Sequence, residues 1–482
     1  MTHGKETLEM KTAMTRIVLA AFWMAGVCAP ALAADPRIGF RGDGTGSFPD
    51  AQPPVKWSAT ENVIWKTPMP GRSNSAPIVV GDRVFTCSEP STLLCVSAAD
   101  GKILWSDTVT YFDYVPEDDL EAAAIIAKVN GAKTEKEKEA IKESLKKDIM
   151  RCDYFEKPPV MGSHFGFILE YTLPTPTSDG KQVYVVYGTG MAAAYGLDGK
   201  RQWVRALDKP RSATGYSANP LLAGGRLVIN MGGFLQGLDT ASGKTAWKVD
   251  HDEYFGSPVR AEVGGTELVV MPMGNVYRAS DGKLLGKGAA INSQLTASVH
   301  GDTVYSAWDE SFSSVKGPKL PPGANYLVMA VRLKATADGT IATEKLWETT
   351  ERPGGYSSPV YHNGLIYNTC SRKTDSGDKL HLVAFDATAG KLVYAHKLGV
   401  GSWQNAGNYP CTTHAGPYIY APLDDGKMFV IKPGREYQEV AFNDLSKGGL
   451  WQGGDQMVGA PLFVGNRIYV RTRNFLFCIG NK

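Results

Sequence analysis

Two histidines are the first residues in this sequence that could do chemistry, because histidine is the side chain whose charge changes near neutral pH. His164, in the segment Gly162–Gly166, and His414 both lie near the starts of predicted strands. A histidine at such a place could act as a general base. It could equally serve as a structural hydrogen-bonding group, and the sequence leaves both interpretations open.

An acidic, glycine-rich stretch, Asp43–Gly46 followed by Asp50, could be taken for a calcium loop, since Ca²⁺ prefers oxygen ligands. It lacks the spaced oxygen ligands of an EF-hand, and an ordinary turn is predicted instead. The sequence also contains no Cys-x-x-Cys pair and no Cys/His cluster with metal-ligand spacing. It therefore predicts no metal site.

Six cysteines follow the N-terminal segment, and one pair of them is a candidate disulfide. If residues 90–92 form a three-residue hairpin loop, Cys87 and Cys95 fall directly opposite each other on neighbouring strands. The alternative is that both are small buried packing groups.

The N-terminus has the three parts of a signal peptide. Lys11 and Arg16 precede the apolar run Ile17–Val27, and Ala31–Ala33 has the small-x-small pattern of a cleavage site. The apolar run is shorter than the roughly 20 residues of a membrane-spanning helix. Cys28 is disfavoured as a lipid acceptor because Val27 stands where a small residue is needed. We expect a signal peptide over 1–33, no transmembrane segment, and a periplasmic or secreted mature protein.

The composition indicates many short strands joined by tight turns, with 53 Gly, 28 Pro and 10 Trp in 482 residues. The 51 Lys and Arg nearly balance the 49 Asp and Glu, for a formal charge of +2. This balance gives no basic excess that would favour a nucleic-acid partner.

A repeated phrase organises the chain: an apolar strand, a glycine-containing turn, and a β-branched or aromatic strand. Glycine supplies the positive φ of a tight hairpin. The turn glycines of the eight copies are Gly81, Gly180, Gly224, Gly264, Gly301, Gly364, Gly416 and Gly465. A second phrase follows most copies and runs from a Gly-Lys turn to an aromatic residue. The aromatics of this second phrase are Trp105, Trp203, Trp247, Trp347 and Tyr394.

Two hairpins per unit, recurring every 40–50 residues or so, predict the four-stranded blades of a β-propeller. The tryptophans are expected to lie between adjacent sheets. The last unit lacks its Trp phrase, and residues 61–67, which contain Trp65, supply that phrase at the other end of the chain. The sequence therefore predicts an all-β, eight-bladed propeller over 57–482, preceded by a leader over 34–56. The strand 61–67 would close the last blade and protect its edge.

Residues 115–151 break the repeats between the first and second blades. Ala122, Ile125, Ile126 and Val129 follow a helical period. Thr134 and Glu137 form a capping-box pattern at the start of a second helix, with Ile141, Leu145 and Ile149 on one face. This helical insertion could be a lid or a partner surface, or a decorated loop on the rim.

The repeat resembles that of the pyrroloquinoline quinone (PQQ) propellers, as in the stretch Asp239–Trp247. This family includes quinoprotein alcohol dehydrogenases and BamB-type assembly lipoproteins. The leader Phe40–Gly42, with Trp57–Lys66, is similar to exported PQQ-like propellers of planctomycete-type bacteria. The resemblance implies the fold more strongly than an activity, because one fold hosts many functions.

The same resemblance implies what a quinoprotein enzyme would need. The large alcohol dehydrogenases hold PQQ against a vicinal Cys-Cys disulfide, bind calcium and use an Asp base. No two cysteines are adjacent in this sequence, and no position matches the Asp motif. No catalytic residue is therefore carried over, and no cofactor is expected, PQQ with calcium being the alternative.

A ligand site is expected where the loops before the innermost strands converge, which we term the funnel mouth. Aromatic and amide side chains in these loops suit a sugar ring, a planar cofactor or a peptide, although the tyrosines could instead pack between blades. The predicted ligand-binding residues are Arg72, Asn74, Tyr216, Tyr254, Gln294, Tyr356, Trp403, Gln404 and Gln452.

Three functions remain open on the sequence. The favoured one is a non-catalytic, monomeric scaffold that binds a small molecule or an envelope protein. A PQQ-dependent dehydrogenase and a BamB-like outer-membrane assembly factor are the alternatives.

Overall fold

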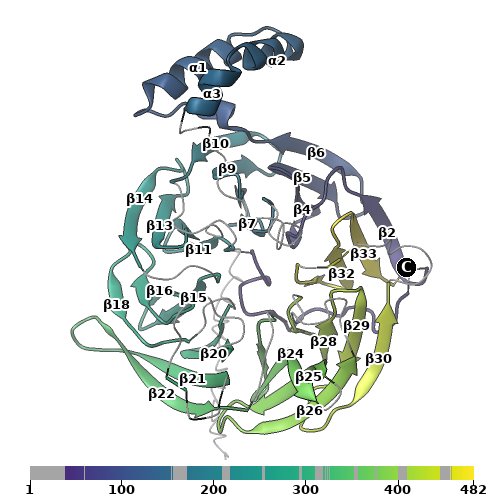
Figure 1. Ribbon diagram of the computed structural model, residues 1–482. Helices are drawn as coiled ribbons and strands as arrows, with labels where there is room; N and C mark the ends of the chain where they lie inside the picture. Colours follow the sequence, from purple (N-terminus) through teal and green to yellow (C-terminus); the bar gives the residue numbers. More distant parts are fainter. Residues whose placement is uncertain are drawn as a thin grey trace, which may run out of the picture. The chain divides into compact units, whose positions relative to one another are not determined.

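Short antiparallel strands joined by tight turns recur through the described part of the chain, and they form eight separate sheets (Figure 1). The computed structural model describes residues 38–58, 60–152, 155, 171–208, 218–251, 256–291, 296–309, 319–320, 322, 324, 326–351, 357–374, 377–399, 410–445, 456–457 and 459–481. The sheets are the blades of an eight-bladed β-propeller, which confirms the predicted fold class.

Each blade contains four antiparallel strands, which follow one another from the channel outward. Blade 1 contains β3 (Ile78–Val80), β4 (Arg83–Ser88), β5 (Thr92–Ser97) and β6 (Ile103–Thr108). Blade 2 contains β7 (Thr177–Ser178), β8 (Gln182–Val186), β9 (Met191–Gly196) and β10 (Arg201–Ala206). Blade 3 contains β11 (Leu221–Ala223), β12 (Arg226–Asn230), β13 (Phe234–Asp239) and β14 (Thr245–Asp250). Blade 4 contains β15 (Val259–Val263), β16 (Thr266–Val270), β17 (Val276–Arg278) and β18 (Leu284–Gly286).

The remaining blades follow the same order. Blade 5 contains β19 (Ser298–His300), β20 (Thr303–Asp309), β21 (Tyr326–Ala335) and β22 (Ile341–Thr349). Blade 6 contains β23 (Val360–His362), β24 (Leu365–Thr374), β25 (Gly377–Asp386) and β26 (Leu392–Gly399). Blade 7 contains β27 (Thr413–Ala415), β28 (Tyr418–Pro422), β29 (Lys427–Ile431) and β30 (Glu439–Asp444), with β1 (Ser47–Phe48) added beside β27. Blade 8 contains β31 (Leu462–Val464), β32 (Arg467–Arg471), β33 (Phe475–Gly480) and β2 (Val63–Pro68).

Burial differs between the middle and outer strands, and the sequence pattern follows it. The middle strands β8 and β9 are buried on both faces, which explains their nearly continuous apolar sequences. The outer strand β14 alternates, with Trp247 buried among exposed neighbours. Neighbouring sheets therefore pack face to face around the ring, and in blade 3 the outer strand is the most exposed of the four.

The tryptophans of the outer strands lie over turn glycines of the next blade. Each indole Nε1 donates a hydrogen bond to a carbonyl of that blade: Trp65 to Ala98, Trp105 to Leu197, Trp203 to Thr240, Trp247 to Ala279, and Trp347 to Ala387. A Cβ on the facing glycine would lie 2.7 Å from the ring at Gly101, 2.8 Å at Gly199, and 2.6 Å at Gly243 and Gly282, and it would lie closer still to the ring at Gly390. These contacts explain why the Gly-Lys turn and the Trp recur together, and they confirm the predicted place of the tryptophans between sheets.

The two ends of the chain meet in blade 8. Strand β2 pairs with β33, and Trp65 lies opposite Cys478 in their register. Trp65 also covers Gly101 of blade 1, while Thr67 Oγ1 donates to the Gly101 carbonyl at 2.7 Å. The N-terminal strand thus completes the last blade and holds it against the first.

Residues 111–151 form a small helical insertion between β6 and β7. It contains η1 (Tyr111–Asp113), α1 (Leu120–Asn130), α2 (Glu135–Ser144) and α3 (Lys146–Arg151). The predicted stripe of α1 is buried, and the capping box of Thr134 and Glu137 is present. The prediction of one second helix was wrong, because the chain breaks at Leu145 into α2 and α3.

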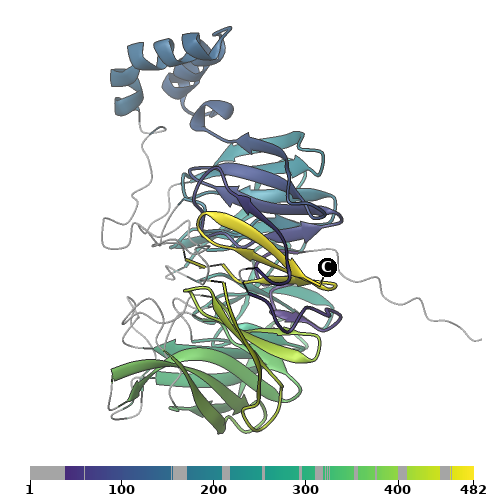
Figure 2. The ribbon, with the colours of Figure 1, turned by 90° about the vertical axis from the view of Figure 1, so that its right-hand side faces the viewer.

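The insertion is joined to blade 2 through the side chain of Arg201 on β10. Its Nε and Nη2 donate to Asp107 at 2.9 and 2.6 Å, and its Nη1 donates to Asp113 at 2.7 Å. The Arg201 hydrogen bond and those from Thr110 outweigh burial and lower the pKa of Asp113. In both views the helices lie outside the ring, beside β6 and β10 (Figures 1 and 2).

The predicted Cys87–Cys95 pairing is corrected by the register of β4 and β5. Ser88 lies opposite Thr92, so Cys87 faces Leu93 and Cys95 faces Phe85. Both cysteines are free and buried, and burial raises the pKa of each thiol to about 12. They act as packing groups because the hairpin loop begins one residue earlier than the sequence suggested.

The Trp–Gly contact can be tested with two glycines of similar backbone conformation. Gly390 has φ +67° and lies under Trp347, whereas Gly339 has φ +78° and open space around it. Either Gly→Ala change is expected to cost about 1–2 kcal/mol for left-handed backbone. Gly390→Ala is expected to lose a further ~1–3 kcal/mol through overpacking against the indole. If urea unfolding showed the same loss of unfolding free energy in both variants, the Trp–Gly contact would not limit the size of the residue at Gly390.

Candidate functional site: the central channel

The leader of the chain lies inside the ring, where Figure 1 shows it as a purple segment surrounded by the blades. Strand β1 pairs in parallel with β27, with Ser47 opposite His414. At the other side of the channel, Ile38 forms a bridge with Ser178 of blade 2. The leader therefore spans the channel between blades 2 and 7. We call residues 38–48 the channel floor.

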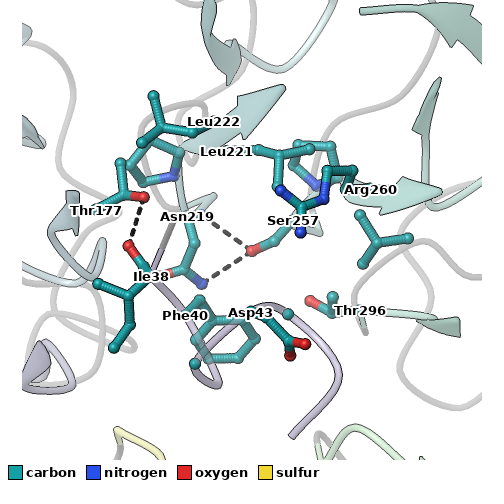
Figure 3. Close-up of a pocket in the computed structure, with 16 residues that line it drawn as sticks. Ile38, Phe40, Asp43, Thr177, Asn219, Leu221, Leu222, Ser257, Arg260 and Thr296 are labelled. Carbon is teal, nitrogen blue, oxygen red and sulfur yellow. Dashed lines mark hydrogen bonds between the residues drawn. The ribbon is translucent and has the colours of Figure 1, made fainter. Parts of the chain in front are cut away.

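A pocket lies between the channel floor and the inner strands of blades 2 to 5 (Figure 3). Phe40 and Asp43 of the floor line one side, and Asn219, Ser257 and Thr296 belong to the blades. Its cavity volume is about 30 Å³, which is room for a water molecule or two rather than for a sugar or a quinone. The floor thus fills most of this part of the channel.

The inner strands begin in a shared way that makes the channel wall rigid. Each inner strand except β27, which has β1 beside it, is the edge of its sheet, so a proline before it removes no ladder hydrogen bond. Prolines stand directly before six inner strands: Pro77, Pro176, Pro220, Pro258, Pro359 and Pro461. Next to them, polar side chains join neighbouring blades, as where Asn219 Oδ1 accepts from Thr175 N at 2.7 Å and Ser257 Oγ accepts from Asn219 N at 2.9 Å.

Two of the predicted ligand-binding residues lie in the segment leading to β3. Arg72 is exposed, and its carbonyl accepts a hydrogen bond from Glu89 N at 2.9 Å. Asn74 is buried, with 3% of its surface exposed. The other seven lie outside the described residues, as does His164: Tyr216, Tyr254, Gln294, Tyr356, Trp403, Gln404 and Gln452. Their role at the funnel mouth stays a prediction.

Glu89, in the β4–β5 turn, is a structural residue at this end of blade 1 that the sequence did not single out. Its carboxylate accepts from Tyr171 N at 3.1 Å, from Thr172 N at 2.7 Å, and from the Thr172 hydroxyl. An acidic residue in a short hairpin turn was the available signal. Glu89 fixes the chain where it returns from the insertion toward blade 2.

His414 is held as a structural group on β27. Ser47 Oγ donates to its Nδ1 at 2.7 Å, and its Nε2 donates to the Gly416 carbonyl at 2.8 Å. Burial, followed by the nearby His362, lowers the pKa of His414 to about 4. The neutral ring therefore joins the floor to blade 7, and both of its nitrogens are engaged.

The loop from Asp43 to Gly46 is a turn, as predicted. Asp43 Oδ1 accepts from Thr45 N at 2.9 Å and from Thr45 Oγ1 at 2.5 Å. Across the described ranges, no three or more His, Cys, Asp or Glu side chains gather to hold a metal ion. Within those same ranges, no helix has the length and apolar character needed to cross a bilayer.

The propeller's family follows from its sequence. A family described as outer membrane protein assembly factor BamB matches residues 31–125 and 169–376. The chain belongs to this family of PQQ-like, BamB-like propellers. No curated protein matches the chain in sequence.

Solved structures show the same fold at low identity. BamB from Moraxella catarrhalis is 11% identical with a TM-score of 0.51, over 87% of this chain and 97% of that one. The quinohemoprotein alcohol dehydrogenase from Comamonas testosteroni is 11% identical with a TM-score of 0.52, over 93% and 81%. At these identities, the similarity is evidence for a shared fold alone.

The pocket beside the channel floor does not fit PQQ. The quinone is far larger than this pocket, and the described residues offer no carboxylate cluster for calcium. We therefore derive no chemistry through this cofactor.

His414 gives the domain a pH dependence that can be measured. Its folded pKa of about 4 lies below the ordinary value near 6.5, so the unfolded chain binds the proton first and stability falls as pH drops from about 6.5 toward 4. Between pH 7 and pH 5 the wild type should lose about 2 kcal/mol through this group.

In urea unfolding, the His414→Gln variant should not show this loss of stability between pH 7 and pH 5. His396→Gln, which changes an exposed histidine on β26, serves as the control and should keep it. The same pH dependence in all three proteins would show that His414 is not the group responsible.

Proposed function

We propose that this chain is an exported, non-catalytic propeller that binds a small molecule or a cell-envelope protein at its funnel mouth. The observation that carries the proposal is the channel floor, which spans the ring between blades 2 and 7. Because the leader crosses the channel, the ring encloses a cup that is closed by the floor rather than a pore. A ligand would then meet the protein at the end where the loops precede the inner strands.

Several features support binding over catalysis. His414, the described candidate base, already uses both ring nitrogens within the protein. The sequence has no adjacent cysteines of the kind that hold PQQ in the large dehydrogenases. Polar side chains cross-link the inner strands of blades 2, 3 and 4, which would limit the movement of this part of the wall. Rigid walls favour binding, since little ordering is needed when a ligand arrives.

The rim and the N-terminus complete the proposal. The helical insertion is fixed to blade 2 through Arg201 and would offer a second contact surface to a large partner. The signal-peptide pattern over 1–33 supports export to the periplasm or beyond. The dehydrogenase and assembly-factor alternatives rest on likeness of fold and family.

The proposal predicts a ligand or partner that depends on the funnel mouth. Protein purified from the exported fraction should carry added mass in native mass spectrometry. Trp403→Ala with Gln404→Ala should remove that mass. Lys181→Ala, at the exposed β7–β8 turn on the other end of an inner strand, should keep it.

A dye-linked oxidation assay separates the enzyme alternative. With PQQ, calcium and primary alcohols or aldoses added, the wild type is expected to show no turnover. Robust turnover that the Trp403 and Gln404 changes abolish would overturn the scaffold in favour of a quinoprotein.

A further inference from the structure

We infer that the channel floor binds an anionic group, a carboxylate or a phosphate, through the guanidinium of Arg41. The inference rests on the proposed function and deepens it, because it names the charge of the ligand that the cup would take. Arg41 belongs to the leader and lies outside the set of residues predicted for the funnel mouth.

The side chain of Arg41 is buried and mostly without hydrogen-bond acceptors. Only 2% of the residue is exposed. Its Nη2 donates to the carbonyl of Pro359 at 2.5 Å, which is a neutral acceptor. Among the described residues, no protein group accepts from Nε or Nη1. Two donor groups of a charged side chain are therefore buried inside the ring without an acceptor.

This arrangement is costly unless an anion joins it. A buried charge without an ionic partner loses its hydration and gains little in return. Burial lowers the pKa of Arg41 but arginine stays protonated in proteins. Asp43, two residues away, stabilises this charge through space but accepts no hydrogen bond from it, because its exposed carboxylate forms the turn with Thr45.

The backbone around Arg41 is shaped to hold the guanidinium. Arg41 itself has φ +57°, a left-handed conformation that is unfavourable for a residue with a side chain. Gly46 has φ +73°, and a Cβ there would lie 2.7 Å from Arg41 Nε. Strained backbone that is retained in a fold is often connected with a binding role.

The guanidinium lies toward the funnel end of the channel. Pro359, its hydrogen-bond partner, directly precedes the inner strand β23. Cys411, whose side chain interacts electrostatically with Arg41, precedes the inner strand β27. Both are at the strand ends reached from the loops that carry Tyr356, Trp403 and Gln404 in the sequence. An anion that enters from these strand ends would approach the guanidinium of Arg41, which lies buried beside them.

Carboxylates and phosphates are the groups that match these donors. Charge-assisted hydrogen bonds from a guanidinium to such oxyanions are about twice as strong as neutral ones. A neutral sugar would leave the charge uncompensated, and a cation would be repelled.

The test uses inorganic phosphate and acetate as probes on the full mature protein, with sodium chloride at matched ionic strength. One or both oxyanions should raise the melting temperature of the wild type with saturation, and the stronger of the two identifies the group. Arg41→Met should lower the affinity for that probe at least tenfold. Because it removes an uncompensated buried charge, Arg41→Met should melt no lower than the wild type in chloride.

Arg435→Met, which changes an exposed arginine paired with Asp386, is the matched control and should bind like the wild type. A crystal structure of the wild type soaked in the stronger probe gives a second readout that needs no variant. The oxyanion should lie within hydrogen-bond distance of Arg41 Nε or Nη1.

Three results would overturn the inference: no saturable effect of either oxyanion, the same effect in Arg41→Met, or soaked crystals in which the oxyanion lies elsewhere. Failure of the proposed function is recognised separately. Loss of the ligand's dependence on Trp403 and Gln404 would count against the funnel mouth, whereas phosphate and acetate report on the channel floor alone.

Discussion

Five indole rings each pack against a turn glycine of the next blade, and this is the contact on which the rest of the structure depends. A four-stranded blade cannot bury both of its faces alone, so its stability comes from its neighbours. The Trp–Gly contact sets how close two blades come, since any side chain on the glycine would clash with the ring. The hydrogen bond from the indole nitrogen then fixes the rotation of one blade against the next.

Ring closure follows from the same contact. Trp65 reaches Gly101 from the N-terminal strand, so the first and last blades meet in the way that others do. Closure requires the N-terminal chain to arrive at the outer edge of blade 8 after leaving the channel. The leader lies inside the ring before β2, and it carries Arg41 and Ser47 to the inner strands of blades 6 and 7.

The regular parts of this molecule could be predicted because they repeat. Eight copies of the Gly turn and several of the Trp phrase define blade number, strand number and the packing of Trp247. Features that occur only once in the chain were harder to predict. The β4–β5 register depends on where one hairpin loop begins, and a shift of one residue separated Cys87 from Cys95. The break at Leu145 interrupts a helical period that the sequence continues.

The site was predicted less well for a physical reason. The leader has no repeat and little secondary structure of its own, so its place in the channel comes from tertiary contacts such as Ser47 with His414. An arginine among Gly42, Gly44 and Gly46 was the only signal for Arg41. Loop residues carry no periodic pattern either, and the predicted residues of the funnel mouth still await a direct test.

Hydrogen exchange in Trp65→Ala tests the central claim, that the two chain ends close one cooperative ring. Removing the indole should cost about 3–5 kcal/mol of unfolding free energy. Because the ring is closed through this residue, exchange should rise in β31–β33 and in β3–β6, the strands on both sides of the closure. A rise confined to β2, with the flanking blades as protected as in the wild type, would contradict the account.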